Sequence, residues 1–257
     1  MSRGFFMAEF ELITFNMHKG MSGVGRKNFV LQAMRQALAE TGADIIFLQE
    51  TVGKNTVNEK RVKDWPALSQ FEYIADSLWP HHAYGKNAHY QSGHHGNAIL
   101  SKYALKSWDN IDVSPYPFAV SRSLLHAVIR VSPQMRAVHL ICVHLGFFAL
   151  ERRGQIRKLC EHIAEQIPHD EPLIIAGDFN DWRGIADKEF DTALELREAH
   201  EDVYGTFARS FPARLPVLRL DRIYFRGLKL EHVEQMKGPQ WRSLSDHVPL
   251  HACFSMG

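Results

Sequence analysis

The stretch PLIIAGDFNDW, residues 172–182, passes from apolar into polar side chains. An apolar run at residues 173–176 is followed by Asp178 and Asn180, which stand two residues apart. In an extended chain alternate side chains point to the same side, so this carboxylate and this amide are predicted to project together from the end of a buried strand. The alternative is a turn, because Asp and Asn that follow a glycine readily bond their own backbone. The rest of the sequence distinguishes the two interpretations.

Length and composition favour one domain over residues 1–257. The chain has 257 residues, of which 45% are hydrophobic, and this is enough for a sizeable single core. Its 30 Lys and Arg residues nearly balance 29 Asp and Glu residues, so the formal net charge is +1. Such a balance excludes a strong positive field around the whole molecule. Any polyanion must therefore be bound locally.

The cysteines and the N-terminus indicate a cytoplasmic protein. The three cysteines include no CxxC pair, and Cys142 and Cys253 lie in apolar runs typical of core strands. We therefore expect neither a disulfide partner nor a zinc site built on thiols. The apolar cluster at residues 5–7 is far too short for a signal peptide, and no later run predicts a transmembrane segment.

The pattern of apolar residues predicts many strands and few helices. Strands are predicted over residues 11–15, 44–49, 97–100, 124–131, 137–143, 173–176, 222–225 and 250–254. Helical spacing appears over residues 27–40 and 150–166. Because the helices are too few to cross over after every strand, a Rossmann or TIM arrangement is disfavoured. The pattern indicates two packed, mostly antiparallel sheets with helices outside.

Polar side chains recur at or just past the ends of these apolar runs. They are Asn16, Glu50, His144, Asp178 and the adjacent pair Asp246 and His247. A single acid at a strand end is usually solvated. When several strand ends meet at one edge, however, carboxylates, amides and imidazoles form a pocket suited to a hard divalent cation and a phosphate.

A series of short motifs extends this pattern over nearly the whole chain. In order they are FNMHKG with Asn16, LQE with Glu50, GNAILS at residues 96–101, SR with Arg122, VHL with His144, GDFN with Asp178 and Asn180, LDRIYF with Asp221, and SDH with Asp246 and His247. The chain thereby resembles the endonuclease/exonuclease/phosphatase superfamily, which includes deoxyribonuclease-I-like nucleases, abasic-site endonucleases, sphingomyelinases and inositol-polyphosphate phosphatases. The resemblance implies a four-layer αββα sandwich of the α/β (α+β) class and a Mg2+- or Mn2+-dependent phosphoester hydrolase.

The resemblance also implies roles for the polar side chains. Glu50 is the first candidate for the metal ligand, since Mg2+ prefers oxygen ligands and keeps several waters beside one or two carboxylates. Asn16 is expected to assist it without adding charge, and Asp246 to contribute to metal binding.

Four further side chains are assigned to catalysis and phosphate binding. Asp178 and Asn180 stand where the family holds the attacking water and the phosphate, which disfavours the turn interpretation. Asp221 resembles the residue that orients His247 and stabilises its imidazolium. Either Asp178 or His247 is the general base. For Asp221 the alternative is a surface ion pair with a neighbouring arginine.

His144 and Arg122 are expected to hold the phosphate. A guanidinium stays charged and binds oxygen pairs bidentately, which suits Arg122 for this task. For His144 the alternative is a satisfied core histidine.

Three other groups lie outside this constellation. The histidine-rich segment 81–95 is predicted to be a loop at the rim of the substrate site, and the basic residues 152–158 a solvated helix face. Phe147 and Phe148 either line a lipid pocket or fill the core.

The family shares one chemistry over very different phosphates, so the motifs leave the substrate open. A nuclease-type phosphodiesterase is favoured. The alternatives are a phosphodiesterase or phosphatase acting on a lipid headgroup or inositol phosphate, and a catalytically silent binding module. The near-neutral charge argues against a nonspecific nuclease.

Overall fold

Two six-stranded sheets form the centre of the computed structural model, which describes residues 8–23, 28–116, 121–184, 186, 190 and 194–256. The first sheet has the order β11-β12-β1-β2-β4-β3, and the second β5-β6-β7-β8-β10-β9. The strands of the first sheet are β11 (Lys229–Gln235), β12 (Leu250–Met256), β1 (Ala8–Asn16), β2 (Ile45–Asn55), β4 (Gly93–Ser101) and β3 (His81–Tyr90). Those of the second are β5 (Leu105–Asp112), β6 (Ser123–Ile129), β7 (Val138–His144), β8 (Leu173–Asp178), β10 (Asp221–Arg226) and β9 (Arg197–Glu198).

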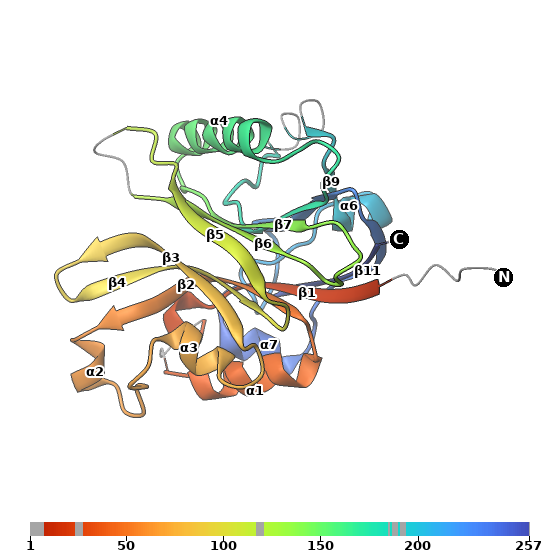
Figure 1. The fold of residues 1–257 in the computed structure, drawn as a ribbon. Helices are drawn as coiled ribbons and strands as arrows, with labels where there is room; N and C mark the ends of the chain where they lie inside the picture. The colour runs from red at the N-terminus through yellow and green to blue at the C-terminus, as the bar shows by residue number, and fades with distance from the viewer. Residues whose placement is uncertain are drawn as a thin grey trace.

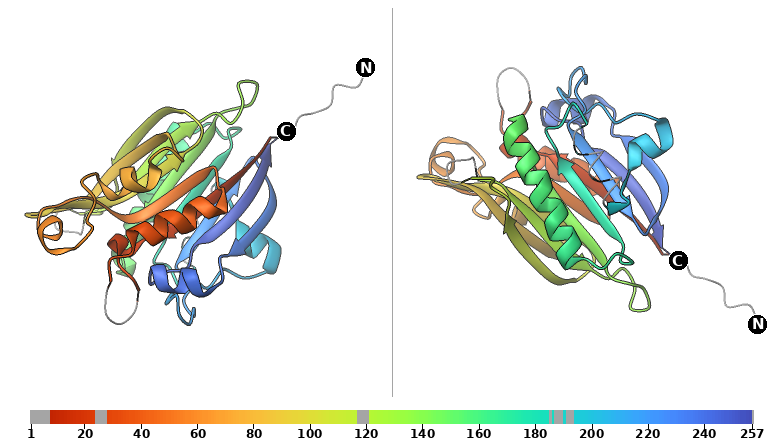
Figure 2. Two further views of the ribbon diagram at one scale, coloured as in Figure 1. Left: turned by 90° about the horizontal axis from the view of Figure 1, so that it is seen from below. Right: turned by 90° about the horizontal axis from the view of Figure 1, so that it is seen from above.

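Helices cover the outer faces of both sheets. The helices are η1 (His18–Gly20), α1 (Leu31–Thr41), α2 (Asn58–Arg61), α3 (Gln70–Ala75), α4 (Ala149–Gln166), α6 (Ala199–Tyr204) and α7 (Pro239–Leu244). Helices α1, α3 and α7 lie on the first sheet, and α4 lies across the second (Figures 1 and 2). The predicted four-layer αββα sandwich is confirmed.

Three apolar clusters hold the four layers together. One lies between the sheets and includes Phe47, Leu140 and Phe254. Another packs the first sheet against its helices, and a third packs α4 against the second sheet. Helix α1 shows how sequence spacing produces such a layer, because its buried residues recur along one face and Gly42, with a φ of 73°, ends it in the left-handed conformation.

Each sheet contains one parallel pair, β1 with β2 and β7 with β8, and the other neighbours are antiparallel. The prediction of mostly antiparallel sheets is therefore confirmed. Parallel neighbours end at the same edge of a sheet. Asn16 pairs with Gln49 at the end of β1, and His144 pairs with Asp178 at the end of β7. These pairings align the polar strand ends that the sequence singles out.

The prediction of a loop over residues 81–95 is wrong. Most of this segment forms the antiparallel hairpin of β3 and β4, with His81 opposite Ser101 and Tyr90 opposite Gly93. Its outer half exposes polar side chains on both faces, so the apolar alternation that identifies a strand is missing there.

The prediction of a solvated basic face on α4 is wrong at one position. Arg152 is fully buried, donates hydrogen bonds to the backbone carbonyls of Gly146 and Phe147, and lies 3.5 Å from Asp181. A buried guanidinium requires such partners.

Cys142 is buried, Cys160 and Cys253 are half-buried, and none of the three forms a disulfide with another described residue. In the part of the chain that the structure describes, no helix combines the length and the apolarity needed to cross a bilayer.

Candidate active site

The polar strand ends meet at one end of the sandwich. Asn16 ends β1, His144 ends β7 and Asp178 ends β8, while Asp221 begins β10 directly opposite Asp178. His247 precedes β12, whose first residue pairs with Thr14 near the end of β1. Both sheets therefore supply side chains to a single site.

Asp178 stands at the centre of this site and is 2% exposed. Its Oδ2 accepts a hydrogen bond from Asn16 Nδ2 at 3.0 Å. The same oxygen lies 3.6 Å from His144 Nε2 and 3.8 Å from His247 Nε2. Burial, followed by the negative charge of Asp221, raises the pKa of Asp178, and His247 opposes that rise.

Asn180 follows the turn interpretation of residues 172–182, and Asp178 alone lies at the end of the buried strand. Its backbone N–H donates to Asp178 Oδ1 at 2.9 Å, and its φ of 49° lies in the left-handed region. This is the turn that Asp and Asn favour. The Asn180 side chain donates to the carbonyl of Leu145 at 3.0 Å, so the turn joins the end of β8 to the segment after His144.

His247 and Asp221 form a buried pair. His247 Nδ1 lies 2.7 Å from Asp221 Oδ2, and the two residues are 6% and 1% exposed. Burial alone would lower the pKa of His247, but Asp221 and then Asp178 outweigh it and raise the pKa to about 10. The alternative for Asp221, a surface ion pair, does not fit, because Asp221 is 1% exposed and its Oδ2 contacts His247.

Glu50 lies beside a cation. Its Oε2 is 3.4 Å from Lys19 Nζ, and its φ of 55° places it just where β2 departs from its partner β4. Burial raises the pKa of Glu50, but the neighbouring His144, Lys19 and His18 outweigh it and lower the pKa to about 2. The carboxylate is therefore ionised at neutral pH.

Asp246 lies next to helix η1, which also carries Lys19. Its Oδ1 is 3.6 Å from His18 Nδ1 and accepts from Ser245 Oγ at 3.3 Å. Ser245 Oγ also donates to the carbonyl of Asn16 at 2.7 Å, which attaches the SDH segment to the end of β1.

The donors at this end suit a hard divalent cation. Among the described residues, three His, Cys, Asp or Glu side chains place their ligand atoms within 4.8 Å of one another on β11 and β12. That cluster lies outside this site. This end offers the ionised Glu50, the Asn16 amide, whose Oδ1 accepts from the His18 N–H at 3.1 Å, and Asp246, which lies 3.6 Å from the His18 ring. One or two carboxylates with waters and substrate phosphate are the usual ligands of Mg2+.

His144 and Arg122 approach the same carboxylates. Burial, followed by the positive charge of Arg122, lowers the pKa of His144 to about 3, so its imidazole is neutral at neutral pH. Burial lowers the pKa of Arg122, and the negative charges of Glu50 and Asp178 oppose this. The buried Nε of Arg122 has no hydrogen-bond partner among the described residues, which leaves a donor for a phosphate oxygen.

Sequence reasoning missed three residues of the site. Lys19 and His18 come from η1, directly after Asn16, and His95 contributes to the electrostatic environment of Glu50 and His144. The HKG tripeptide that follows Asn16 was the available signal for the first two. His95 belongs to the segment predicted as a loop.

Aromatic side chains border the site. Phe147 and Phe148 are 61% and 66% exposed, which excludes the core interpretation. The ring of Phe147 lies 5.3 Å from that of Trp182, and Arg152 is over the Trp182 ring at 5.2 Å. Phe147 and Phe148 follow His144 closely in sequence, and Trp182 follows Asn180, so we call this exposed cluster of three rings the aromatic rim.

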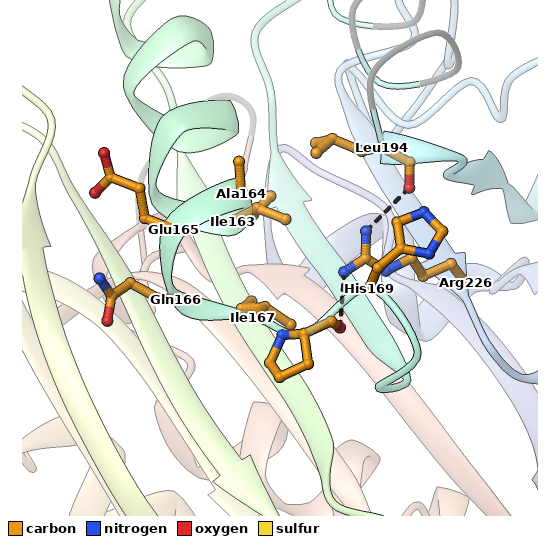
Figure 3. Close-up of a pocket in the computed structure, with 9 residues that line it drawn as sticks. Ile163, Ala164, Glu165, Gln166, Ile167, His169, Leu194 and Arg226 are labelled. Atoms are coloured by element: carbon orange, nitrogen blue, oxygen red, sulfur yellow. Dashed lines mark hydrogen bonds between the residues drawn. The ribbon is translucent and has the colours of Figure 1, made fainter.

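A separate hollow of about 430 Å³ lies at the other end of β10, lined by Ile163, Gln166, His169, Leu194 and Arg226 among others (Figure 3). The Arg226 guanidinium donates to the carbonyls of Leu194 at 3.1 Å and Pro168 at 3.3 Å. Arg226 thus ties the end of α4 to the segment before β9, and we assign it a structural role.

The sequence model described as "Endonuclease/Exonuclease/phosphatase family" matches residues 13–247. Among curated relatives, the uncharacterized protein YbhP of Escherichia coli K12 is 41% identical over 245 residues, which is 95% of each chain. A UPF0294 protein of Vibrio parahaemolyticus is 27% identical over 189 residues, 72% of this chain and 63% of the relative.

Solved structures show the same fold. Human Nocturnin's catalytic domain with a bound sulfate anion has a TM-score of 0.74 at 16% identity, over 97% of this chain and 95% of that one. TDP2 of D. rerio complexed with single-strand DNA product has a TM-score of 0.70 at 20% identity, over 96% and 99%.

Proposed function

Because this chain belongs to the endonuclease/exonuclease/phosphatase family, whose members are phosphoester hydrolases, we propose that it is a divalent-metal-dependent phosphodiesterase of the nuclease type. The observation that carries the proposal is the position of Asp178, which faces His144, His247 and Asn16 at the meeting point of both sheets. With the polar positions of the site all present, we set aside the catalytically silent binding module.

The two carboxylates around His247 suggest separate catalytic roles for Asp178 and His247. Asp221 holds Nδ1 at 2.7 Å, and Asp178 lies 3.8 Å from Nε2. Two flanking carboxylates favour an imidazolium, which can donate a hydrogen bond to a phosphate oxygen as negative charge develops. We therefore assign Asp178 to orienting and deprotonating the attacking water, and His247 to stabilising the phosphate.

Glu50, Asn16 and Asp246 would hold a Mg2+ or Mn2+ ion. Bound there, the cation would supply charge neutralisation at the phosphate. Lys19, 3.4 Å from Glu50, keeps that carboxylate ionised and ready to ligate. Arg122 and neutral His144 would donate to the phosphate oxygens, and Asn180 would hold the turn that positions Asp178.

A nucleic acid is the substrate that we favour. Exposed Phe147, Phe148 and Trp182 offer faces on which unpaired bases could stack, an interaction that tolerates any sequence. The formal net charge of +1 does not favour a duplex-wide grip. We therefore expect action near an end or a single-stranded segment. The three cysteines, none of them in a disulfide, support a reducing, cytoplasmic setting.

One observation favours a second candidate, a lipid headgroup or inositol phosphate. Leu150 is 75% exposed next to Phe147 and Phe148, and an exposed aliphatic and aromatic rim is also suited to acyl chains.

A substrate panel with Mg2+ at two salt concentrations tests both candidates. It comprises plasmid DNA, single-stranded DNA, abasic duplex, RNA, phospholipid headgroup esters and inositol phosphates. We expect cleavage of single-stranded nucleic acid with only a modest salt dependence, since log K falls by about 0.7 per neutralised phosphate on single strands. Intact nucleic acids at enzyme levels that cleave a lipid or inositol phosphate would overturn the nuclease assignment.

A further inference from the structure

Three metal-ligating side chains converge on the outer face of the first sheet, at its β11 edge. They are His232 and Glu234 on β11 and His251 on β12, and one ligand atom of each lies within 4.8 Å of the other two. Glu234 Oε1 is 3.9 Å from His232 Nε2 and 3.5 Å from His251 Nδ1. The proposed catalytic residues contribute none of these atoms.

Strand register brings these side chains together. The antiparallel pairing of β11 with β12 places Glu234 directly opposite His251. His232 lies two residues before Glu234 on the same strand, so both project from the same face. All three side chains thus stand on paired strands, whose backbone fixes their spacing better than a loop would.

A fourth residue supports His251 from behind. His251 is only 14% exposed, and its second ring nitrogen, Nε2, is buried without a hydrogen-bond partner among the described residues and lies 3.4 Å from Glu11 Oε2 on the neighbouring strand β1. Metal-ligating histidines commonly place a carboxylate on the nitrogen that does not bind the metal, which fixes the tautomer and orients the ring. A proton on Nε2 would leave the Nδ1 lone pair for the position between Glu234 and His232.

The same face is negatively charged. Glu9 and Glu11 on β1 and Glu231 on β11 lie around Cys253, which is opposite His232 in the β11–β12 register. This concentration of carboxylates favours a cation at the cluster.

We propose that His232, Glu234 and His251 form a binding site for a divalent transition-metal ion, with Zn2+ the ion best suited to the donors. Two imidazoles with one carboxylate is a ligand set that suits zinc, whereas Mg2+ prefers oxygen ligands throughout. Three protein ligands leave a fourth position for water or another donor. The ion would join edge strand β11 to β12 and stabilise the folded state by mass action.

Isothermal titration with Zn2+ in the presence of excess Mg2+ tests the site directly. We expect one Zn2+ to bind to the wild type and to Glu50→Gln, and affinity to fall by at least about tenfold in His232→Gln and Glu234→Gln. His232 and Glu234 are about half exposed, so these variants are expected to fold. His169→Gln, which removes an exposed histidine elsewhere, is the matched control and should bind as the wild type does.

A second pair of variants distinguishes the orientation of His251 by Glu11 from the general attraction of Zn2+ to negative charge on β1. Glu11→Gln should weaken Zn2+ binding by about tenfold or more, because it removes the carboxylate behind His251. Glu9→Gln removes the same charge from the same strand and should change the affinity much less. Zn2+ should also raise the melting temperature of the wild type but not that of His232→Gln. Equal Zn2+ binding by wild type and folded His232→Gln, or no Zn2+ binding by the wild type, would overturn the proposal.

Discussion

Strand β7 carries a histidine at each end, and the two belong to very different groups. His144 at its end faces Asp178, which is 2% exposed, in the group that also contains His247 and Asp221. His139 near its start belongs to a chain of imidazoles under helix α4. Both histidines are 6% exposed, so burial alone does not explain why one group forms a candidate active site.

The second group passes hydrogen bonds from ring to ring. His162 Nε2 lies 3.0 Å from His126 Nδ1, and His126 Nε2 lies 2.9 Å from His139 Nδ1. His139 Nε2 ends the chain 2.5 Å from Glu171, whose side chain is 32% exposed. Burial, followed by the neighbouring His139 and His162, lowers the pKa of His126 to about 4. The His126 imidazole therefore stays neutral at neutral pH.

The difference teaches that a buried histidine becomes charged where a buried carboxylate touches its ring nitrogen. Asp221 does so at 2.7 Å from His247 Nδ1, whereas His144, 3.6 Å from Asp178, stays neutral. At the catalytic end Asp221 and Asp178 raise the pKa of His247, and an imidazolium can stabilise a developing negative charge. Under α4 the imidazoles satisfy one another, and the result is structural.

The largest expected effect comes from Asp221→Asn, which removes the charge that makes the two groups differ. Turnover at saturating metal should fall by about 100- to 10,000-fold, because His247 loses the carboxylate that orients it and favours its charged form. Steady-state kinetics on the substrate found in the panel measure it. His126→Gln is the matched control in the other group and should keep turnover within about twofold. Wild-type turnover in folded Asp221→Asn would remove Asp221 from the site.

The next effect concerns stability towards acid. The pKa of His126 is lowered in the folded state from 6.5 to about 4, so between these values the unfolded chain binds more protons. The contribution of the neutral His126 imidazole to the free energy of unfolding is present in full above pH 6.5 and is lost as the pH falls towards 4. It amounts to roughly 3 kcal/mol at most.

Chemical denaturation across this pH range measures the difference between wild type and His126→Gln. The variant should lose less of its unfolding free energy on acidification than the wild type does. Parallel pH profiles would show that the histidine chain does not titrate as described.

A smaller effect is expected from Glu50→Gln, which tests whether the Glu50 carboxylate supplies the negative charge that binds the metal ion. The amide keeps the shape of the side chain but not the charge that attracts a cation, so the Mg2+ concentration for half-maximal activity should rise about tenfold or more. Activity at saturating Mg2+ should recover in part. Identical metal titrations for wild type and variant would remove Glu50 from the ligands, and full turnover after exhaustive EDTA treatment would contradict metal dependence.

The smallest effect is expected from Glu171→Gln, at the exposed end of the histidine chain. A partly exposed charged partner contributes about 1 kcal/mol or less, and glutamine can still accept the hydrogen bond from His139. Urea unfolding at neutral pH measures this change. A loss of several kcal/mol would mean that Glu171 controls the chain as strongly as Asp221 controls His247.

The sequence predicted the fold well wherever one face of an element is apolar. The predicted helix over residues 150–166 corresponds closely to α4, Ala149–Gln166, and the predicted strand over 173–176 lies within β8. Strands β3, β5 and β11 were missed because much of their surface is polar and exposed, so hydrophobic alternation is weak. The predicted helix over 27–40 is observed from Leu31, and its first residue, 27, lies outside the described part of the chain.

The candidate site was predictable at strand ends, where a polar residue interrupts an apolar run, as at Asp178 and His144. Lys19 was not predicted, because its contact with Glu50 depends on the positive φ of both residues, and no apolar pattern in the sequence reveals a positive φ. Arg152 was misplaced because its partners are backbone carbonyls and Asp181, brought close only by the fold. The cluster on β11 and β12 requires strand register, which a single sequence does not supply.

The position of β12 has a consequence for synthesis of the protein. In the first sheet β12 lies between β11 and β1, so β1 is synthesised long before the strand that pairs with it on this side. Until the ribosome has released β12, one side of β1 has no partner, and His247 cannot meet Asp221 and Asp178. The proposed catalytic group is therefore complete only after β12 is inserted. A chaperone that shields β1 during translation would protect the protein at its most vulnerable stage.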